Sequence, residues 1–357
     1  MNLVPDAFAD HLIDTPPAAE NSLAVYTTLR LGGPAGTLTT AVHADEAVET
    51  VRAASSAGRP VLVLAGGSNV VIGDAGFPGE TLLLRTGGIE VVGEDPSSVV
   101  VRVAAGETWD DFVSYAVTNG WSGVECLSGI PGSAGATPIQ NVGAYGQEVG
   151  HTIEAVHAYD RVADEIRRMT PAECGFGYRA SVFKHNDRYL VLSVDFRLAK
   201  SGDSAPIRYA ELARSLGGEA GDRVPLGLAR DTVLKLRAGK GMVLDPEDRD
   251  TWSVGSFFTN PVISEELFRT LGEIPHWPAG DDMVKLPAAW LIERAGFPKG
   301  FAGDGVAISG KHTLALTNRG AGSTTALLDL ARTIRDGVRE RFGVDLHPEP
   351  VLVNCEF

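Results

Sequence analysis

One stretch of 19 residues, Ser128–Gly146, constrains this chain more than any other part of its sequence. It contains five glycines and two prolines. Because glycine allows a close backbone approach and proline fixes the backbone, we expect a rigid loop that lies against something flat or bulky. Gln140, Asn141 and Tyr145 add amide and hydroxyl groups suited to a polar ring edge. The alternative is a purely structural surface loop.

The composition limits the class of protein. The 42 glycines among 357 residues are about 12%, above the usual ~7%, but no Gly-X-Y period makes this a collagen. The length favours two or three domains, and the share of apolar and charged residues is that of a globular protein. A net charge of −15 argues against a nucleic-acid or anionic-membrane partner, but not against small anions, which respond to local charge.

The sequence predicts neither a membrane span nor a signal peptide, and its cysteines do not suggest a disulfide or metal site. The longest apolar stretch, 60–72, is interrupted by glycine and polar residues, so no membrane span is expected. Residues 1–20 are acidic and proline-containing, which predicts a loose leader and no signal peptide. Three scattered cysteines, Cys126, Cys174 and Cys355, favour buried thiols in a reducing cytoplasm over disulfides or a metal site.

Apolar periodicity predicts an α+β fold, in which helices and strands are mixed along the chain. The expected helices are 44–57, about 108–119 and 324–342, the last capped by Ser323 and ended by Gly343. The expected strands are 37–42, 60–64, 81–85, 99–104, 155–159, 189–198 and 350–353, with the second and last of these buried. The polar stretches 200–205 and 217–222 are the best candidates for linkers.

A second glycine loop follows the strand at 60–64. Gly66, Gly67, Ser68 and Asn69 place successive backbone N–H groups at the end of a strand, beside a hydroxyl and an amide. Such a loop can hold phosphate oxygens without net positive charge, although an ordinary glycine turn explains it equally well. Neither a Walker loop nor a Gly-x-Gly-x-x-Gly motif is present, so a dinucleotide here would not be bound in the Rossmann manner.

Three further segments carry side chains with chemical potential. In 177–184, Arg179 offers a planar fork for a carboxylate and Lys184 a point charge for a phosphate. In 253–261, Ser256 stands between a glycine and two phenylalanines, with no Gly-x-Ser-x-Gly elbow of a hydrolase. Glu349, between two prolines, is a candidate for proton handling. Solvated surface residues are the alternative for Arg179 and Glu349.

Together and in this order, these motifs resemble the UDP-N-acetylenolpyruvoylglucosamine reductases of peptidoglycan synthesis. The resemblance runs from TTLRLGGPA at Thr27 through AGGSNVV, SGIPGSAGATPIQNVGAYG, GYRASVFK, VGSFFTNPV and KLPAAWLIERAG to HPEPVLV, and so covers nearly the whole chain. It implies a two-lobed, non-Rossmann FAD-binding domain of the PCMH type followed by an α+β substrate-binding domain. The implied boundaries are 21–88 and 89–215 for the two lobes, 223–345 for the substrate domain and 346–357 for a terminal strand.

The resemblance also implies a reaction. NADPH would reduce FAD, and the flavin would pass hydride to the enolpyruvyl ether of UDP-N-acetylglucosamine. Protonation of the neighbouring carbon would complete the lactyl ether of UDP-N-acetylmuramate. The family works in the cytoplasm, and we expect a monomer without nucleic acid, membrane insertion or metal.

Functional residues carry over by position. Arg179, Ser256 and Glu349 match the catalytic set: Arg179 and Glu349 would offset enolate charge, and Ser256 would donate the proton. A set of glycine-loop residues would bind FAD: Gly66, Gly67, Ser68, Asn69, Ser133, Pro138, Gln140, Asn141, Gly143 and Tyr145. Residues that would bind the substrate are Tyr178, Tyr209, Lys240 and Asn260. Where some members of the family carry a substrate-binding arginine, this chain has Val351.

Two other functions compete with this interpretation. The first is another FAD oxidoreductase with the same binding lobe, such as an alcohol or hydroxy-acid oxidase. Those enzymes often attach the flavin through His or Cys, which neither glycine loop contains. The second is an inactive flavin- or nucleotide-sugar-binding module, which would have no need for Arg179, Ser256 and Glu349 together.

Overall fold

The computed structural model describes residues 21–357, so the predicted leader at 1–20 lies outside the described residues. The chain forms two compact units, each assembled from separate segments of sequence. Unit 1 comprises the described part of Met1–Pro34, together with Val70–Gly76 and Leu244–Phe357; unit 2 comprises Ala35–Asn69 and Phe77–Val243. The predicted lobe boundaries, 21–88 and 89–215, stay a prediction. The contacts between residues define these two units and do not separate an FAD-binding domain into two lobes.

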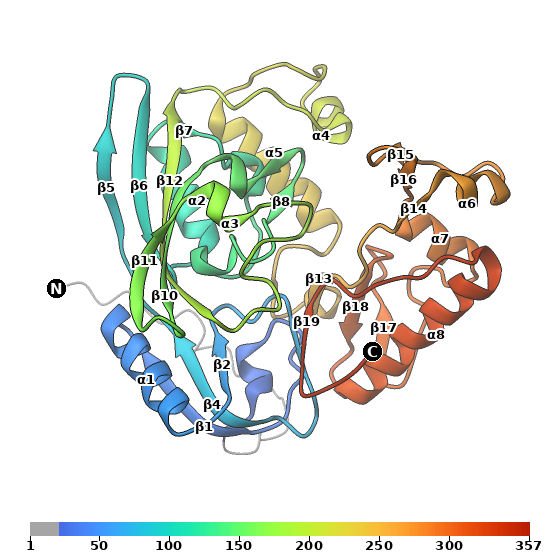
Figure 1. The fold of residues 1–357 in the computed structure, drawn as a ribbon. Helices are drawn as coiled ribbons and strands as arrows, with labels where there is room; N and C mark the ends of the chain where they lie inside the picture. The colour runs from blue at the N-terminus through green and yellow to red at the C-terminus, as the bar shows by residue number, and fades with distance from the viewer. Residues whose placement is uncertain (1–20) are drawn as a thin grey trace. The chain divides into compact units, whose positions relative to one another are not determined.

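Unit 2 begins with a small parallel sheet covered by a helix (Figure 1). Its strands run in the order β1 (Ala35–Ala41), β4 (Phe77–Leu84), β2 (Val61–Leu64). Helix α1 (Ala44–Ser56) packs on β1 and β4. The apolar residues at helical spacing, Ala47, Val48, Val51 and Ala54, are all buried, as their spacing predicts.

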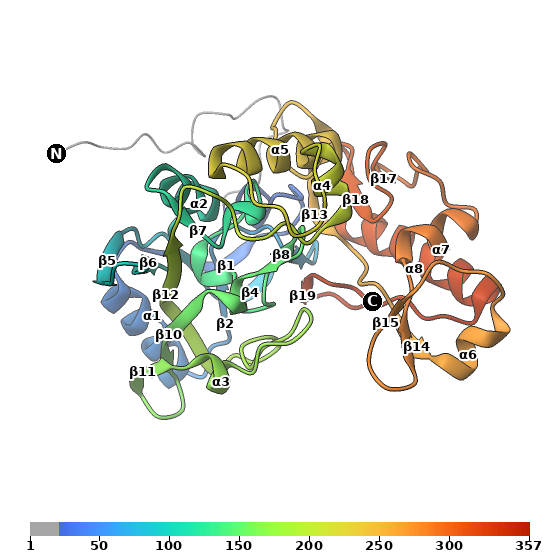
Figure 2. The same cartoon turned by 90° about the horizontal axis from the view of Figure 1, so that it is seen from above.

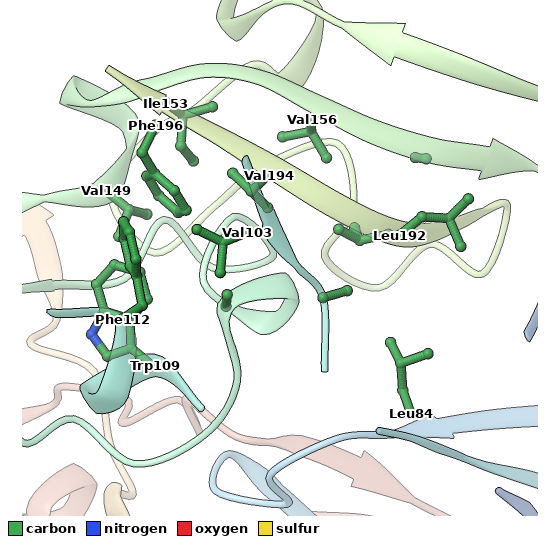
Figure 3. Close-up of a cluster of buried hydrophobic side chains, with 14 of the residues drawn as sticks. Leu84, Val103, Trp109, Phe112, Val149, Ile153, Val156, Leu192, Val194 and Phe196 are labelled. Carbon is green, nitrogen blue, oxygen red and sulfur yellow. The ribbon is translucent and has the colours of Figure 1, made fainter. Parts of the chain in front are cut away.

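A larger antiparallel sheet contributes many of the other residues in the main core of unit 2. Its strands run in the order β11 (Glu165–Met169), β10 (Ile153–Asp160), β12 (Tyr189–Lys200), β6 (Ser98–Ala104), β5 (Ile89–Glu94), and β7 (Trp121–Ser122) also pairs with β12. Trp109 and Phe112 of α2 (Trp109–Thr118) lie against Phe196 of β12, with ring centroids 5.0–5.6 Å apart (Figure 3). This aromatic cluster anchors the helix on the sheet.

One further helix, α5 (Leu226–Gly239), and several short elements fill the remainder of unit 2. The short elements are η2 (Glu125–Leu127), η3 (Ala134–Ala136), β8 (Gly143–Ala144), β9 (Gln147–Glu148), η4 (Val149–His151), α3 (Pro171–Cys174) and α4 (Ala210–Ser215). The two segments favoured as linkers, 200–205 and 217–222, lie inside this unit. The buried Glu125 carboxylate accepts hydrogen bonds from the backbone N–H groups of Gly123 (2.6 Å) and Ala205 (2.6 Å), which ties the first of these segments down.

Unit 1 joins three small sheets and the longest helix. Antiparallel strands run in the order β13 (Ser253–Ser256), β18 (Ala315–Asn318), β17 (Val306–Ile308), and in the order β14 (Val262–Ser264), β16 (Met283–Lys285), β15 (Trp277–Pro278). Strand β19 (Val351–Val353) pairs in parallel with β3 (Val70–Ile72). The short helices are η1 (Leu23–Tyr26), η5 (Arg249–Thr251), α6 (Glu265–Thr270) and α7 (Ala288–Arg294).

The predicted bounds of the long helix are confirmed. Helix α8 spans Thr324–Phe342 and lies beside α7 (Figure 2). The Ser323 hydroxyl accepts the N–H of Ala326 (3.0 Å), and Gly343 ends the helix in the left-handed conformation (φ 65°). No helix within residues 21–357 is long and apolar enough to span a membrane.

Three expectations of burial are wrong. In β2 only Leu64 is buried, because β2 is an edge strand of its sheet. In β19 only Val353 is buried, because that strand has a single neighbour. Cys126 and Cys174 are buried thiols, but Cys355 is half-buried near the end of the chain.

Candidate active site

The two glycine-rich loops, which 58 residues separate in the sequence, contact each other inside unit 2. A Cβ atom on Gly66 would lie 2.4 Å from the Cα atom of Gly132, so the two backbones touch at this point. The Ser68 hydroxyl donates to the carbonyl of Pro131 (2.9 Å), and the Asn69 amide donates to Gln140 Oε1 (2.8 Å). The sequence motifs therefore form one continuous surface.

Ser133 is the clearest sign that this surface receives a ligand. Its side chain is buried, and its hydroxyl has no hydrogen-bond partner among the residues that the structure describes. A buried polar group left unpaired costs about 1–3 kcal/mol, so such a group indicates a missing polar partner. In the first loop, Gly67 adopts φ +57°, a left-handed conformation that glycine reaches without strain.

Other predicted cofactor residues shape the loop through contacts with protein. The Asn141 amide donates to Glu148 (3.0 Å) and to the carbonyl of Gly177 (3.1 Å), and its oxygen accepts the N–H of Gly150 (2.9 Å). The Pro138 carbonyl accepts the N–H of Asn141 (3.3 Å). These bonds fix the path of the loop.

Arg179 lies in a tight turn against the same loop. Gly177 and Ala180 exchange backbone hydrogen bonds (3.0 and 3.3 Å), and Arg179 between them has φ +52°, a strained conformation for a side-chain-bearing residue. Its guanidinium donates to the carbonyl of Gly143 (2.9 Å) and lies 5.5 Å from the ring centroid of Tyr178. The turn thus holds two predicted site residues, Tyr178 and Arg179, next to a third, Gly143.

Tyr145, Tyr209 and Lys240 form a second group in unit 2. The two tyrosine rings meet edge to face at 5.5 Å, and the Lys240 ammonium lies 5.8 Å from the Tyr145 ring centroid. Lys240 also pairs with Glu211 at 2.6 Å. Burial opposes the charge on Lys240, but the hydrogen bond to Glu211 raises its pKa above the ordinary value. Tyr145 therefore lies beside two predicted substrate residues, and its assignment to the flavin stays a prediction.

Sequence reasoning missed Arg237 and Glu211 in this region. Arg237 lies one helical turn before Lys240, and burial lowers the pKa of its guanidinium to about 10. It donates to the carbonyl of Met242 (2.7 Å), while its Nε has no hydrogen-bond partner within residues 21–357. Arg237 could have been found from the sequence, because it lies three residues before Lys240 and so on the same face of a helix. Nothing local marked Glu211 as the partner of a lysine 29 residues away.

Ser256 and Glu349 lie on neighbouring backbone segments of unit 1. Ser256 ends β13 and pairs with Ala315 of β18. The N–H of Glu349 donates to the carbonyl of Phe257 (2.8 Å), and Phe258 forms a bridge with Pro348. Both Ser256 and Glu349 are half-buried, beside the buried ring of Phe257. The structure thus places the backbone segments of these two predicted catalytic residues side by side.

Two more residues of unit 1, Asn260 and His312, lie in or contact this region. The Asn260 side-chain oxygen accepts the N–H of Ala288 (2.9 Å), which ties this predicted substrate residue to the start of α7. The Ser256 hydroxyl lies 3.3 Å from Nε2 of His312, a residue that sequence reasoning missed. That Arg179 acts together with Ser256 and Glu349 stays a prediction.

Comparison with protein families decides which proteins this chain resembles. Residues 37–166 match the FAD binding domain, and residues 245–353 match the C-terminal domain of UDP-N-acetylenolpyruvoylglucosamine reductase. The chain is 60% identical over 352 residues to a UDP-N-acetylenolpyruvoylglucosamine reductase of Salinispora arenicola, covering 96% of this chain and 97% of that one. This chain belongs to the UDP-N-acetylenolpyruvoylglucosamine reductase family.

Further matches agree with membership of this reductase family. The chain is 54% identical over 342 residues to the Thermobifida fusca protein of that name, covering 93% and 96% of the two chains. Among solved structures, the Thermus caldophilus UDP-N-acetylenolpyruvylglucosamine reductase shares its fold, with a TM-score of 0.64 at 23% identity, over 93% of this chain and 97% of that one. The predicted α+β fold with an FAD-binding domain is confirmed.

Proposed function

We propose that this protein reduces the enolpyruvyl ether of UDP-N-acetylglucosamine to UDP-N-acetylmuramate, with NADPH as the reductant and FAD as the bound cofactor. The observation that carries the proposal is the 60% identity to a reductase of this name over 96% of the chain. An oxidase that shared the FAD-binding lobe alone would not match over residues 245–353 as well.

The glycine loops of unit 2 fit the cofactor. Gly66 and Gly132 leave no room for side chains where the loops meet, and the unpaired hydroxyl of Ser133 supplies a buried donor for a polar group. Backbone N–H groups at Gly67 and Ser68 suit the diphosphate of FAD. When bound, FAD supplies the acceptance and release of hydride.

The side chains of the chain would then manage charge and protons. Hydride addition to the enolpyruvyl group places negative charge on its carboxylate, and the Arg179 fork suits that carboxylate. Ser256 would donate a proton to the carbon next to the carboxylate. Glu349 is half-buried, on a backbone segment next to that of Ser256. In its protonated form, the Glu349 carboxyl would stabilise the negative charge that develops on the enolpyruvyl group.

Substrate diphosphate would be held by cations of unit 2. Lys240 carries a full charge beside two tyrosine rings, and Tyr178 and Tyr209 are exposed enough to cover a nucleotide sugar. The local cations explain how a chain with a net charge of −15 can bind polyanions. We further propose a cytoplasmic monomer that binds neither nucleic acid nor metal.

The test is direct. The purified protein should be yellow, should release FAD on heat denaturation, and should, without oxygen, oxidise more than one NADPH per flavin only when the enolpyruvyl sugar nucleotide is added. Mass spectrometry of the product should show the gain of two hydrogens. A colourless protein that does not take up added FAD would refute the proposal, and a yellow protein without NADPH turnover would favour an inactive flavin-binding module.

A further inference from the structure

The contact between Ser256 and His312 joins residues that lie 56 positions apart. The Ser256 Oγ atom is 3.3 Å from His312 Nε2, within reach of a hydrogen bond. Both side chains are half-buried. His312 is not among the catalytic residues expected from the family resemblance, and no sequence motif pointed to it. Its position beside the proposed proton donor therefore requires an explanation.

The backbone holds the histidine opposite the serine. The Ser309 hydroxyl accepts the N–H groups of Lys311 (3.0 Å) and His312 (3.3 Å), which fixes the turn between β17 and β18. The His312 carbonyl accepts the N–H of Ala315 (3.1 Å), and Ala315 pairs with Ser256 in the sheet. The ring of His312 is therefore placed by the same hairpin that positions Ser256.

The chemistry of a serine donor explains why a histidine is useful there. A hydroxyl carries one hydrogen and two lone pairs. To give its proton to carbon, Ser256 must keep that hydrogen free of other acceptors, so its second partner has to be a donor. A hydroxyl is also a poor acid, because the alkoxide left behind is unstable without a donor to stabilise it.

We propose that His312 is the positioning residue of Ser256: its Nε2–H donates to Oγ, directs the hydroxyl hydrogen toward the substrate carbon and returns a proton to the serine. In the step, the Oγ–H bond breaks as the new C–H bond forms. The Nε2–H proton then passes to Oγ as Nδ1 takes up a proton from solvent, so that the ring stays neutral, and proton exchange with solvent restores the Nε2–H form. This inference rests on the proposed role of Ser256.

A purely structural role for His312 makes a different prediction. A histidine that only braces the hairpin would affect both half-reactions, or protein stability alone, when it is replaced. A histidine that acts through Ser256 affects only the step that needs the serine proton. The half-reactions can be separated, because NADPH bleaches the flavin and the enolpyruvyl sugar restores its colour.

The experiment compares His312→Ala, His312→Gln, Ser256→Ala and the double variant by anaerobic stopped-flow absorbance. We expect His312→Ala to slow flavin reoxidation by roughly 10- to 100-fold and to leave bleaching by NADPH unchanged; this is less than the roughly 10²- to 10⁴-fold of a direct proton donor, because His312 acts through Ser256. His312→Gln keeps an amide N–H and should recover part of the rate. The double variant should be no slower than Ser256→Ala, because the two residues act as one unit.

The matched control is His276→Ala, an exposed histidine of unit 1 whose ring lies against Phe268 (4.2 Å between centroids) and whose Nδ1 lies 3.0 Å from the carbonyl of Ile274. It should leave both half-reactions unchanged. Equal slowing of both half-reactions in His312→Ala and His312→Gln, or additive losses in the double variant, would overturn the inference. If Ser256→Ala itself reoxidised at the normal rate, the proposed function of Ser256 would fail instead; if only His312→Ala did, the inference alone would fail.

Discussion

The glycine loops of unit 2 and the Ser256–Glu349 region of unit 1 are built on opposite principles. The loops Gly66–Asn69 and Ser128–Gly146 offer mainly backbone, packed so closely that a single added Cβ would clash. The unit 1 region offers side chains, Ser256, Glu349 and His312, on adjacent backbone segments. One region is a shaped surface, and the other is a set of functional groups.

This difference determines how each region should fail. Adding atoms to the loops should impair FAD binding, because the surface itself changes shape. Removing atoms in unit 1 should leave the flavin bound and slow only the chemistry that uses the missing group. Each prediction below tests whether this division holds.

Ser256→Ala should give the largest effect. We expect flavin reoxidation by the enolpyruvyl sugar to slow by roughly 10²- to 10⁴-fold, since a positioned proton donor contributes about that much. NADPH-driven bleaching and FAD content should stay unchanged, as measured by stopped-flow absorbance and flavin spectra. The control Ser55→Ala removes an exposed hydroxyl of α1 that donates to the carbonyl of Val51 and accepts from Arg161. Equal slowing of both half-reactions would assign Ser256 a structural role.

Glu349→Gln should follow, with a loss of about 10- to 10³-fold confined to the same half-reaction, because the amide keeps the size but not the proton chemistry of the carboxyl. Single-turnover reoxidation measures it. Glu356→Gln, an exposed change in the same terminal segment, should behave like the parent protein. Unchanged turnover in Glu349→Gln would remove the carboxyl from the mechanism.

Gly66→Ala tests the glycine loops of unit 2 and should weaken FAD binding. The new Cβ would meet the Gly132 backbone at 2.4 Å, and overpacking of this kind costs about 1–3 kcal/mol, a factor of roughly 5–150 in FAD affinity. Titration of flavin-free protein with FAD measures the affinity. Gly202→Ala is the control, since no atom lies within 4 Å of its added Cβ. Full affinity in Gly66→Ala would mean that the loop contact does not shape the cofactor site.

Ser133→Ala should have a smaller effect. It should weaken FAD binding but should not lower the stability of the flavin-free protein. Its buried hydroxyl lacks a protein partner in the part of the chain that the structure describes. Removing it should weaken FAD binding by about 2- to 10-fold, the worth of one hydrogen bond, yet leave the flavin-free protein as stable or more stable. Calorimetry and thermal unfolding test the pair. A less stable flavin-free variant would mean that Ser133 is a structural residue.

Glu211→Gln should give the smallest effect. Glu211 holds the Lys240 ammonium at 2.6 Å, with both side chains about one-third exposed, so it competes with any diphosphate for that charge. We expect uridine diphosphate to bind up to about 5-fold more tightly, the range for a pair worth up to about 1 kcal/mol. Glu219→Gln, exposed in the same unit, is the control. Weaker binding in Glu211→Gln would show that the pair organises the site rather than competing for it.

Local sequence predicted those elements whose signals are complete within the element. Helix α8 has an apolar stripe, a serine cap and a terminal glycine, and its bounds agree with the structure. Helix α5 was missed, because its interior carries Gly227 and several charged residues and buries only Leu226, Ala229 and Val233. The motif loops were recognisable because a backbone that touches another backbone requires glycine.

Contacts between distant residues were beyond reach of the sequence. Ser256 and His312 are paired by sheet register, and Lys240 and Glu211 by the packing of α5 against α4, neither of which a local pattern encodes. The motif places Tyr145 among the residues predicted to bind the flavin, and only the structure shows that it also contacts Tyr209 and Lys240. A motif identifies which residues matter, but tertiary contacts decide what each one faces.

The central claim is that electrons from NADPH reach the enolpyruvyl sugar through FAD bound by this chain. The most direct measurement is anaerobic addition of the enolpyruvyl ether of UDP-N-acetylglucosamine to the NADPH-reduced protein, with the flavin spectrum recorded over time. Our account predicts full return of the oxidised spectrum with formation of one UDP-N-acetylmuramate for each flavin. A flavin that stays reduced in the presence of that substrate would contradict it.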